Sequence, residues 1–484
     1  MYVMIIMFLL TSLWIILSST NALKGDFNSD GSLTLNDAIF GVQVLACMRK
    51  EPPKPSFVMI NLGDSLTNGT QSGLQNVHEP TQRNGFVHLL AEQLKTKVEL
   101  EWSIPYLKKN TGCPPEGLQY NLERISPDEI PYNLGVDSAT IKQLIHEKTT
   151  DNPLLKRLMA PIPNLVKKPV SQLEAALYVA GLHPDKKVIF TVWTGNNDVL
   201  WSVINNYGQE ITEKQIKAYL NDTSAEHDLI SVKNNLTHVV KKLKAIPGSH
   251  IFIGTLPYMT RPAFFFSKKD IERLTQFPNP KITALVEGES IGFGPFLHLA
   301  NLGAFSAASN NETANAAISQ LTDTHKLSPN EIAIVDERID QINEHIQSLT
   351  SPGKVTVVNT FDIFQQIYEN KVTIKGHQIY KTFGCGGFSF DAFHPSNTTH
   401  AMLANKFIEK INESLQLSIP LIDIKAVFDT DPYQDRDGDH FAPGPGDNIV
   451  GSEVLVYKLF DCDDSNKSIG ATFVTKLPCQ AKKK

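Results

Sequence analysis

Near its amino end the chain reads Val58-Met59-Ile60-Asn61-Leu62-Gly63-Asp64-Ser65-Leu66-Thr67-Asn68-Gly69. The apolar half of this stretch predicts a buried strand, and the Gly-Asp pair predicts a turn directly after it. Ser65 therefore stands at the carboxyl end of a strand, where an α/β sheet presents reactive side chains. The same residues also fit a strand followed by a helix N-cap, because Asp and Ser both cap helices. This stretch alone does not decide whether Ser65 is a nucleophile or part of a helix cap.

Apolar strands alternate with helical segments through the central part of the chain. Further strands are predicted at 187–194, 250–256 and 354–358. Two stripes with a spacing of 3.6 residues predict long helices; they consist of Val335, Ile339, Ile342 and Ile346, and of Ala404, Phe407, Ile408, Ile411 and Leu415. This alternation predicts an α/β domain over residues 56–424, with a doubly wound parallel sheet and helices on both faces.

Composition limits the class of protein. The chain has 484 residues and a net charge of −6, and its Lys and Arg residues form no cluster that would predict nucleic-acid binding. Residues 4–18 form an apolar run, and Thr20-Asn21-Ala22 suits signal cleavage. A signal peptide is thus predicted over residues 1–22, with export to the periplasm, cell surface or medium. The segment has no positive region before it, which leaves an uncleaved membrane anchor open.

A short acidic module is predicted over residues 23–50. Oxygen side chains occupy positions 1, 3, 5 and 12 of a calcium-type loop, with Gly31 at the sharp turn, and they belong to Asp26, Asn28, Asp30 and Asp37. Ser32, at position 7, can offer its backbone carbonyl. This order predicts structural Ca²⁺, although an Asx turn with solvated carboxylates fits too. The spacing resembles one repeat of a dockerin. A full dockerin has two repeats, which argues against cohesin binding here.

A Pro-rich linker at 51–55 separates this module from the central domain, and an acidic tail follows it at 425–484. The tail resembles the Asp-rich calcium-binding segments of secreted bacterial proteins, and its candidate ligands are Asp435, Asp437, Asp439, Asp461 and Asp463. A disordered acidic tail is the alternative. If the protein is exported, Cys462 with Cys479 and Cys113 with Cys385 are the candidate disulfides. Cys47 would then have no partner.

Three further segments carry polar groups of catalytic type. Gly195-Asn196-Asn197-Asp198 follows a strand, and the Asn197 amide suits donation to an oxyanion, although the segment is also turn-prone. Asp391 and His394 are three residues apart, so one loop can place a carboxylate beside an imidazole; an ordinary polar turn is the alternative. Residues 132–141 open a helix whose backbone N–H groups could face an anion.

Together, and in this order, the segments resemble the SGNH (GDSL) hydrolase family over roughly residues 56–415. The first block matches at Gly63-Asp64-Ser65-Leu66, the third at Gly195, Asn197 and Asp198, and the fifth at Asp391, His394 and Pro395. The second block matches at Asn133, Ala139 and Thr140 but has Ser138 where the family has its oxyanion glycine. The serine is not in a Gly-x-Ser-x-Gly elbow, which argues against an ordinary α/β-hydrolase.

The resemblance implies a three-layer α/β/α, flavodoxin-like fold and assigns roles to matching residues. Ser65 would be the nucleophile, His394 the general base and Asp391 the residue that orients the imidazole. The oxyanion hole would combine the backbone N–H groups of Ser65 and Ser138 with the Asn197 side chain. No catalytic cofactor or metal is implied.

Two insertions bear on the substrate. Residues 154–182, and the stretch between 256 and 331 with its Phe264-Phe265-Phe266, would line an acyl pocket, form a lid or extend the core. They favour lipid or aliphatic esters and allow contact with a membrane surface. The dockerin-like repeat suggests a polysaccharide acetylesterase instead. A calcium-dependent surface or adhesion protein without activity is a third hypothesis, against which the intact Ser65, Asn197, Asp391 and His394 argue.

Overall fold

The computed structural model describes residues 54–71, 79–108, 123–204, 212–275, 282–292, 311–322, 325–382 and 385–437, together with residues 35, 38, 39, 299 and 442. The predicted signal peptide and all five predicted ligands of the first calcium loop lie outside this part of the chain. No helix within it is both long and apolar enough to cross a bilayer.

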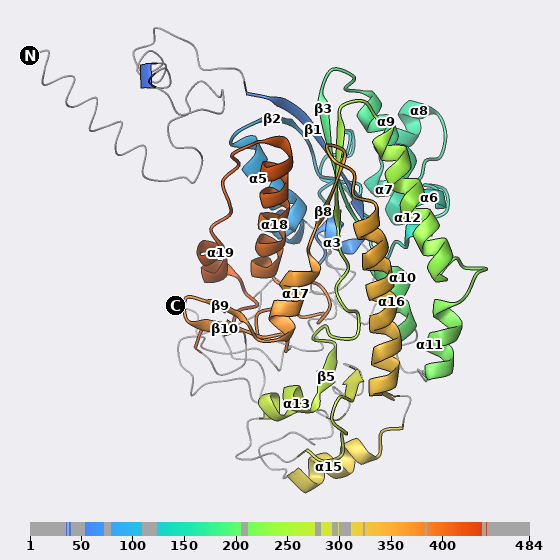
Figure 1. Ribbon diagram of the computed structural model, residues 1–484, viewed down its shortest axis with the longest axis vertical. Coiled ribbons are helices and arrows are strands. Elements are labelled where there is room, and N and C mark those ends of the chain that lie inside the picture. Colours follow the sequence, from blue (N-terminus) through green and yellow to red (C-terminus); the bar gives the residue numbers. More distant parts are fainter. Residues whose placement is uncertain are drawn as a thin grey trace, which may run out of the picture.

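A parallel sheet of five strands forms the centre of the molecule (Figure 1). Its order is β2-β1-β3-β4-β8, and its strands are β1 (Ser56–Gly63), β2 (Glu99–Glu101), β3 (Lys187–Trp193), β4 (Ser249–Gly254) and β8 (Val355–Val358). The inner strands β1 and β3 are buried after their first residue, because they are covered on both faces. The predicted doubly wound α/β fold is confirmed.

Helices cover both faces of this sheet (Figure 1). One layer contains α5 (Phe86–Lys95) and α18 (Asn397–Leu415), with α17 (Phe361–Tyr368) and α19 (Ile424–Thr430) beside α18. The other layer contains α6 (Ile141–His146), α9 (Gln172–Gly181), α12 (Leu229–Lys244) and α16 (Pro329–Ser348). The predicted stripe of α16 is fully buried; its members are Val335, Ile339, Ile342 and Ile346.

Shorter elements complete the fold. The remaining helices are α3 (Ser65–Asn68), α4 (Glu79–Asn84), α7 (Pro153–Leu158), α8 (Ile162–Val166), α10 (Asn196–Ile204), α11 (Glu213–Leu220), α13 (Lys268–Thr275) and α15 (Asn311–Ser319). Two small antiparallel sheets consist of β5 (Phe265–Ser267), β6 (Ser290–Gly292) and β7 (Lys326–Leu327), and of β9 (Val372–Ile374) and β10 (His377–Ile379). The first of these sheets belongs to the insertion between β4 and α16.

The strand order positions the functional residues. The chain passes from β1 to β2 on one side of the sheet, whereas β3 lies on the other side of β1, so the order reverses between β1 and β3. Gly63, at the carboxyl end of β1, pairs with Trp193 at the carboxyl end of β3. Ligands of open α/β sheets bind at such a reversal, outside the carboxyl ends of the strands. Ser65 and Asn196 follow these two strand ends.

Candidate active site

Ser65 lies in the tight turn that follows β1. Asp64 caps α3, and its Oδ1 accepts a hydrogen bond from the N–H of Leu66 at 3.0 Å. A β-carbon on Gly63 would collide with Thr67 Oγ1 and with the last carbonyl oxygen of β3, so only glycine fits here. The cap and the candidate nucleophile are therefore neighbouring residues of one turn.

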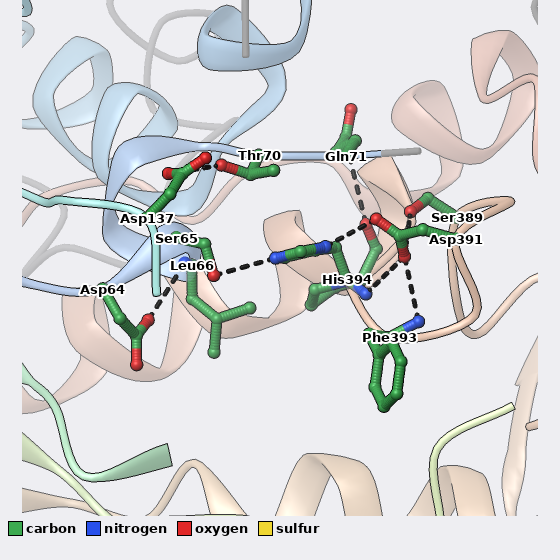
Figure 2. A network of polar contacts seen from close by, with 11 residues as sticks. Asp64, Ser65, Leu66, Thr70, Gln71, Asp137, Ser389, Asp391, Phe393 and His394 are labelled. Atoms are coloured by element: carbon green, nitrogen blue, oxygen red, sulfur yellow. Dashed lines mark hydrogen bonds and ion pairs between the residues drawn. The ribbon is translucent and has the colours of Figure 1, made fainter. Parts of the chain in front are cut away.

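His394 reaches Ser65 from a short loop that folds back on itself. We call residues 386–396 the histidine hairpin: Phe388 and Pro395 form a bridge, and the N–H of Ser389 donates to the His394 carbonyl at 2.8 Å. The His394 Nε2 lies 2.8 Å from the Ser65 Oγ (Figure 2). This contact joins two residues 329 positions apart in the sequence.

Asp391 lies on the opposite side of the imidazole, so that Figure 2 shows Ser65, His394 and Asp391 in one line. The His394 Nδ1 lies 2.5 Å from one Asp391 carboxylate oxygen. The other oxygen accepts the backbone N–H groups of Phe393 and His394 at 2.9 and 2.8 Å. These bonds fix the carboxylate and so orient the ring. The structure thus brings together the three predicted catalytic residues.

Charge and burial shift the pKa values of this pair. Burial alone would lower the pKa of His394, but the charge and hydrogen bond of Asp391, with smaller contributions from Asp137 and Asp64, raise it above 6.5. Burial alone would raise the pKa of Asp391, yet His394 and the backbone N–H groups hold it below 3.8. The carboxylate therefore remains ionised beside the imidazole, as a histidine that must take up a proton requires.

The loop that carries Ser138 runs along β1 and α3. The Asn133 side-chain amide donates to the Thr67 carbonyl at 2.8 Å, and the N–H of Val136 donates to the Gly63 carbonyl at 3.1 Å. Ser138 has a φ of 64°, in the left-handed region that glycine adopts without strain. The backbone conformation therefore accounts for the glycine that the resemblance expects at this position.

The predicted oxyanion donors differ in what they contact. Within the described ranges, the backbone N–H groups of Ser65 and Ser138 donate to no other residue. The Asn197 amide, at the start of α10, donates to the Ala139 carbonyl at 3.1 Å, beside Ser138. Their role as oxyanion donors stays a prediction.

The sequence decides the family. Residues 59–407 match the model of the GDSL-like lipase/acylhydrolase family. The chain belongs to the GDSL-like lipase/acylhydrolase family. No curated protein matches the chain in sequence.

Several solved structures are similar at low identity. A phospholipase A1 from Streptomyces albidoflavus is 11% identical, with a TM-score of 0.33, and the match covers 75% of this chain and 99% of that one. An extracellular lipase from Streptomyces rimosus is 10% identical, with a TM-score of 0.31 and coverages of 74% and 99%. An acetyl xylan esterase variant from Geobacillus stearothermophilus is 12% identical, with a TM-score of 0.31 and coverages of 74% and 95%.

Two buried side chains that the sequence did not single out hold the turn around Ser65 in this GDSL-family protein. Gln172, the first residue of α9, accepts from the Gly63 N–H at 2.8 Å and donates to the Gly63 carbonyl at 3.0 Å. The Asn196 amide donates to the free oxygen of the Asp64 cap at 2.8 Å. Burial raises the Asp64 pKa to about 6, against the lowering effect of its hydrogen bonds. The turn is thus tied to both α9 and α10.

Asp137 is a further buried carboxylate near the imidazole, and sequence reasoning missed it. One oxygen accepts the Asn68 amide at 2.9 Å and the Thr70 hydroxyl at 2.8 Å, while the other has no hydrogen-bond partner among the described residues. Figure 2 shows its contact with the Thr70 hydroxyl. Burial raises its pKa, and its charge raises the pKa of His394. Its only sequence signal is its place directly before Ser138.

The insertion between β4 and α16 contacts the histidine hairpin. The N–H of Phe264 donates to the Ala392 carbonyl at 3.0 Å, and the Phe264 ring stacks on Phe393. Deeper in the insertion, the buried Asp270 pairs with Lys381 at 2.9 Å, just before the hairpin. The sequence left a pocket lining, a lid and a core extension open for this insertion. The observed contact is with the loop that carries His394.

The predicted calcium ligands of the tail lie largely outside the described residues. Asp439, Asp461 and Asp463 do so, whereas Asp435 and Asp437 follow α19. The described part of the chain contains no group of three or more His, Cys, Asp or Glu residues placed to hold a metal ion. Cys385 is buried, and the other four cysteines lie outside the described ranges, so calcium binding and disulfide pairing stay predictions.

Proposed function

We propose that this GDSL-family protein is a serine esterase or lipase that hydrolyses carboxylic esters of lipids or aliphatic acids through an acyl-enzyme. The observation that carries the proposal is the continuous line of short contacts from Ser65 Oγ through His394 to Asp391. An imidazole held in this way can take the hydroxyl proton as the oxygen attacks.

In the proposed reaction, the Ser65 Oγ forms a bond to the ester carbonyl carbon while its proton passes to His394 Nε2. The carbonyl oxygen becomes an oxyanion, which the N–H groups of Ser65 and Ser138 and the Asn197 amide stabilise. The tetrahedral intermediate collapses, the bond to the alcohol oxygen breaks, and His394 returns the proton to the leaving alcohol. Water then attacks the acyl-enzyme with the same base, and the acid and free Ser65 are released.

The preference for lipid or aliphatic acyl groups draws support from the aromatic insertion. Phe264 is buried, and its ring stacks on that of Phe393, the residue that precedes His394 in the chain. If aromatic side chains of this insertion line the acyl site, they would favour aliphatic chains over hydrated sugars, because burial of each CH₂ contributes about 0.8 kcal/mol. A panel of p-nitrophenyl acyl esters, run against acetylated xylan, separates the two substrate classes. Preference for the acetylated sugar would exclude the lipid proposal and favour a polysaccharide acetylesterase.

Ser65→Ala tests the mechanism. Ester hydrolysis should fall by on the order of 10⁴-fold or more, because the nucleophile is removed. A fluorophosphonate probe should label the wild type and leave the variant unlabelled. Ser348→Ala is a matched control: this serine on α16 is exposed, its hydroxyl donates to the His345 carbonyl of the same helix, and activity should be unchanged. Full hydrolysis by Ser65→Ala would show that another group attacks, whereas a wild-type protein that hydrolyses no ester would favour the inactive surface protein.

We further propose export and structural Ca²⁺ in the acidic segments. The support is the sequence alone: an apolar leader, and loop oxygens in calcium-type order. A thermal melt of the full chain with and without EDTA tests the calcium proposal, since a ligand that binds only the folded state raises the melting temperature. An unchanged melt argues against structural calcium. Amino-terminal sequencing of the exported protein distinguishes a cleaved signal from a retained anchor.

A further inference from the structure

The chain beyond the end of the family match returns to the histidine hairpin. The match ends at residue 407, in α18, and α19 then packs against that helix. Asp431 and Gln434 follow α19 and are completely buried. Tyr433 lies between them in the chain, and its ring packs edge to face on Phe390 with the ring centroids 5.1 Å apart. Phe390 directly precedes Asp391. This later segment therefore lies directly behind the residues that carry the charge network.

Asp431 holds the carboxyl-terminal end of the histidine hairpin. One of its oxygens accepts both the backbone N–H and the hydroxyl of Thr398, at 2.8 and 2.6 Å. Thr398 lies in the first turn of α18, which Ser396 caps at the end of the hairpin. A carboxylate at this end also interacts favourably with the helix dipole. The chain thus runs from His394 to the N-cap of α18 within two residues, and Asp431 holds the first turn of that helix.

Gln434 holds the amino-terminal end of the same hairpin. Its side-chain amide donates to the Gly386 carbonyl at 2.9 Å and to the Asp431 carboxylate at 2.8 Å. Gly386 has a φ of 98°, and a β-carbon there would collide with the Gln434 side-chain oxygen. The two ends of the hairpin are therefore joined through one pair of buried side chains, Asp431 and Gln434.

We infer that Asp431 and Gln434 are positioning residues for His394, and that the catalytic unit extends past the family match to at least residue 434. The inference rests on the proposed function. Neither side chain contacts Ser65, His394 or Asp391; both act through the hairpin ends at Gly386 and Thr398. A shift of about 1 Å at a reacting group can cost on the order of 100-fold in rate. Fixing both ends limits such shifts at the imidazole.

Gln434→Met tests the inference in the full-length protein. Methionine keeps the length of the side chain but removes the hydrogen bonds that the amide donates to Gly386, to Asp431 and, at 3.4 Å, to the Ser396 hydroxyl. We expect kcat on a p-nitrophenyl ester to fall on the order of 10- to 100-fold with KM within about twofold, because the chemical step and not binding depends on the His394 position. The low-field proton resonance of the His394–Asp391 hydrogen bond should weaken or shift. Asp429→Asn is the matched control, because Asp429 lies on α19 and pairs only with the exposed Lys375.

Melting curves test whether the role of Gln434 is only structural. In that case Gln434→Met would melt at a lower temperature but keep the wild-type kcat and resonance when folded. That result would overturn the inference. Should Gln434→Met fail to fold, Thr398→Val removes only one donor to Asp431 and should lower kcat in the same direction by less. Wild-type kcat in folded Thr398→Val would then count against the inference. An inactive Ser65→Ala beside a fully active Gln434→Met would reject this inference and leave the proposed function standing.

Discussion

The rings of Phe264 and Phe393 are stacked with their centroids 4.3 Å apart and an interplanar angle of 26°. Phe264 belongs to the insertion between β4 and α16, and Phe393 directly precedes His394. The insertion therefore supports the outer side of the histidine hairpin, while the segment after α19 holds its ends.

Truncation of this contact should cost both stability and rate. Phe264→Ala removes a large buried ring and should lower the free energy of unfolding by about 3 kcal/mol, measured by urea denaturation. Because the lost ring also supports the hairpin, kcat should fall in protein that is still folded. Val286→Ala is the control, since Val286 lies in the same insertion and is 62% exposed. Unchanged kcat in folded Phe264→Ala would mean that the insertion does not support the hairpin.

The pH dependence of hydrolysis should follow His394. The base must be neutral, and its pKa is raised, so kcat/KM should decline as the pH falls through a midpoint above 6.5. Asp391, Asp137 and Asp64 all favour the protonated ring, whereas the neighbouring His400, with a pKa lowered to about 3 by burial, stays neutral.

Removal of one of these carboxylates should move the midpoint. Asp137→Asn takes away a negative charge near the ring but keeps the side-chain shape, so the midpoint of the acid limb should drop. The exposed Asp151→Asn serves as the control and should leave the profile in place. A profile of Asp137→Asn with the wild-type midpoint would show that Asp137 does not act on the imidazole.

Asp64 should make stability depend on pH. Its pKa rises from 3.8 to about 6 on folding, so the folded state binds more protons than the unfolded state between these values. Wild-type stability should therefore decrease as the pH rises through this window, by about 3 kcal/mol at roughly 1.4 kcal/mol per tenfold change in proton affinity. Asp64→Asn has no carboxyl group to titrate at this position, so its stability should not decrease for this reason. Its unfolding free energy relative to wild type should rise between pH 4 and pH 7.

The surroundings of Asp64 can accept this substitution. The Asn196 side-chain oxygen has no hydrogen-bond partner among the described residues, so rotation of its amide would present that oxygen to the new amide group. Denaturation at both pH values measures the difference. A stability difference that stays constant with pH would show that Asp64 titrates alike in both states.

Ser138→Gly should stabilise the protein by about 0.5 to 1 kcal/mol. The gain comes from relief of the left-handed backbone at φ 64°, reduced by the greater freedom of glycine in the unfolded chain. Activity should stay within about twofold of wild type, because the backbone N–H is retained. Ser138→Ala keeps a β-carbon and should gain nothing. If Ser138→Gly and Ser138→Ala have the same melting temperature, the left-handed backbone at this position does not strain the wild-type serine.

The sequence predicted those parts of the molecule that leave a local pattern. The apolar runs of β1, β3, β4 and β8 mark buried strands, and the three-residue spacing of Asp391 and His394 allows one loop to hold both. Strand β2 was not predicted because it has only three residues, with Leu100 between two glutamates. Nothing local marks an edge strand of that length.

Long-range hydrogen bonds leave no such pattern. Gln172 bonds both backbone groups of Gly63 from 109 positions away, and Gln434 reaches Gly386 across 48. In the sequence each is an ordinary polar residue, and only its burial in the folded chain separates it from a surface glutamine. The backbone twist at Ser138 is likewise invisible, except that the family resemblance expects glycine there.

The separation of Ser65 from His394 has a consequence for biosynthesis. During synthesis Ser65 leaves the ribosome early, whereas His394 follows 329 residues later and Gln434 later still. Under the proposed mechanism, a nascent chain that ends before His394 holds Ser65 without its general base and should hydrolyse esters far more slowly than the whole domain. In that mechanism, full activity would appear only after the segment with His394 and Gln434 has been synthesised and has packed against the rest of the domain.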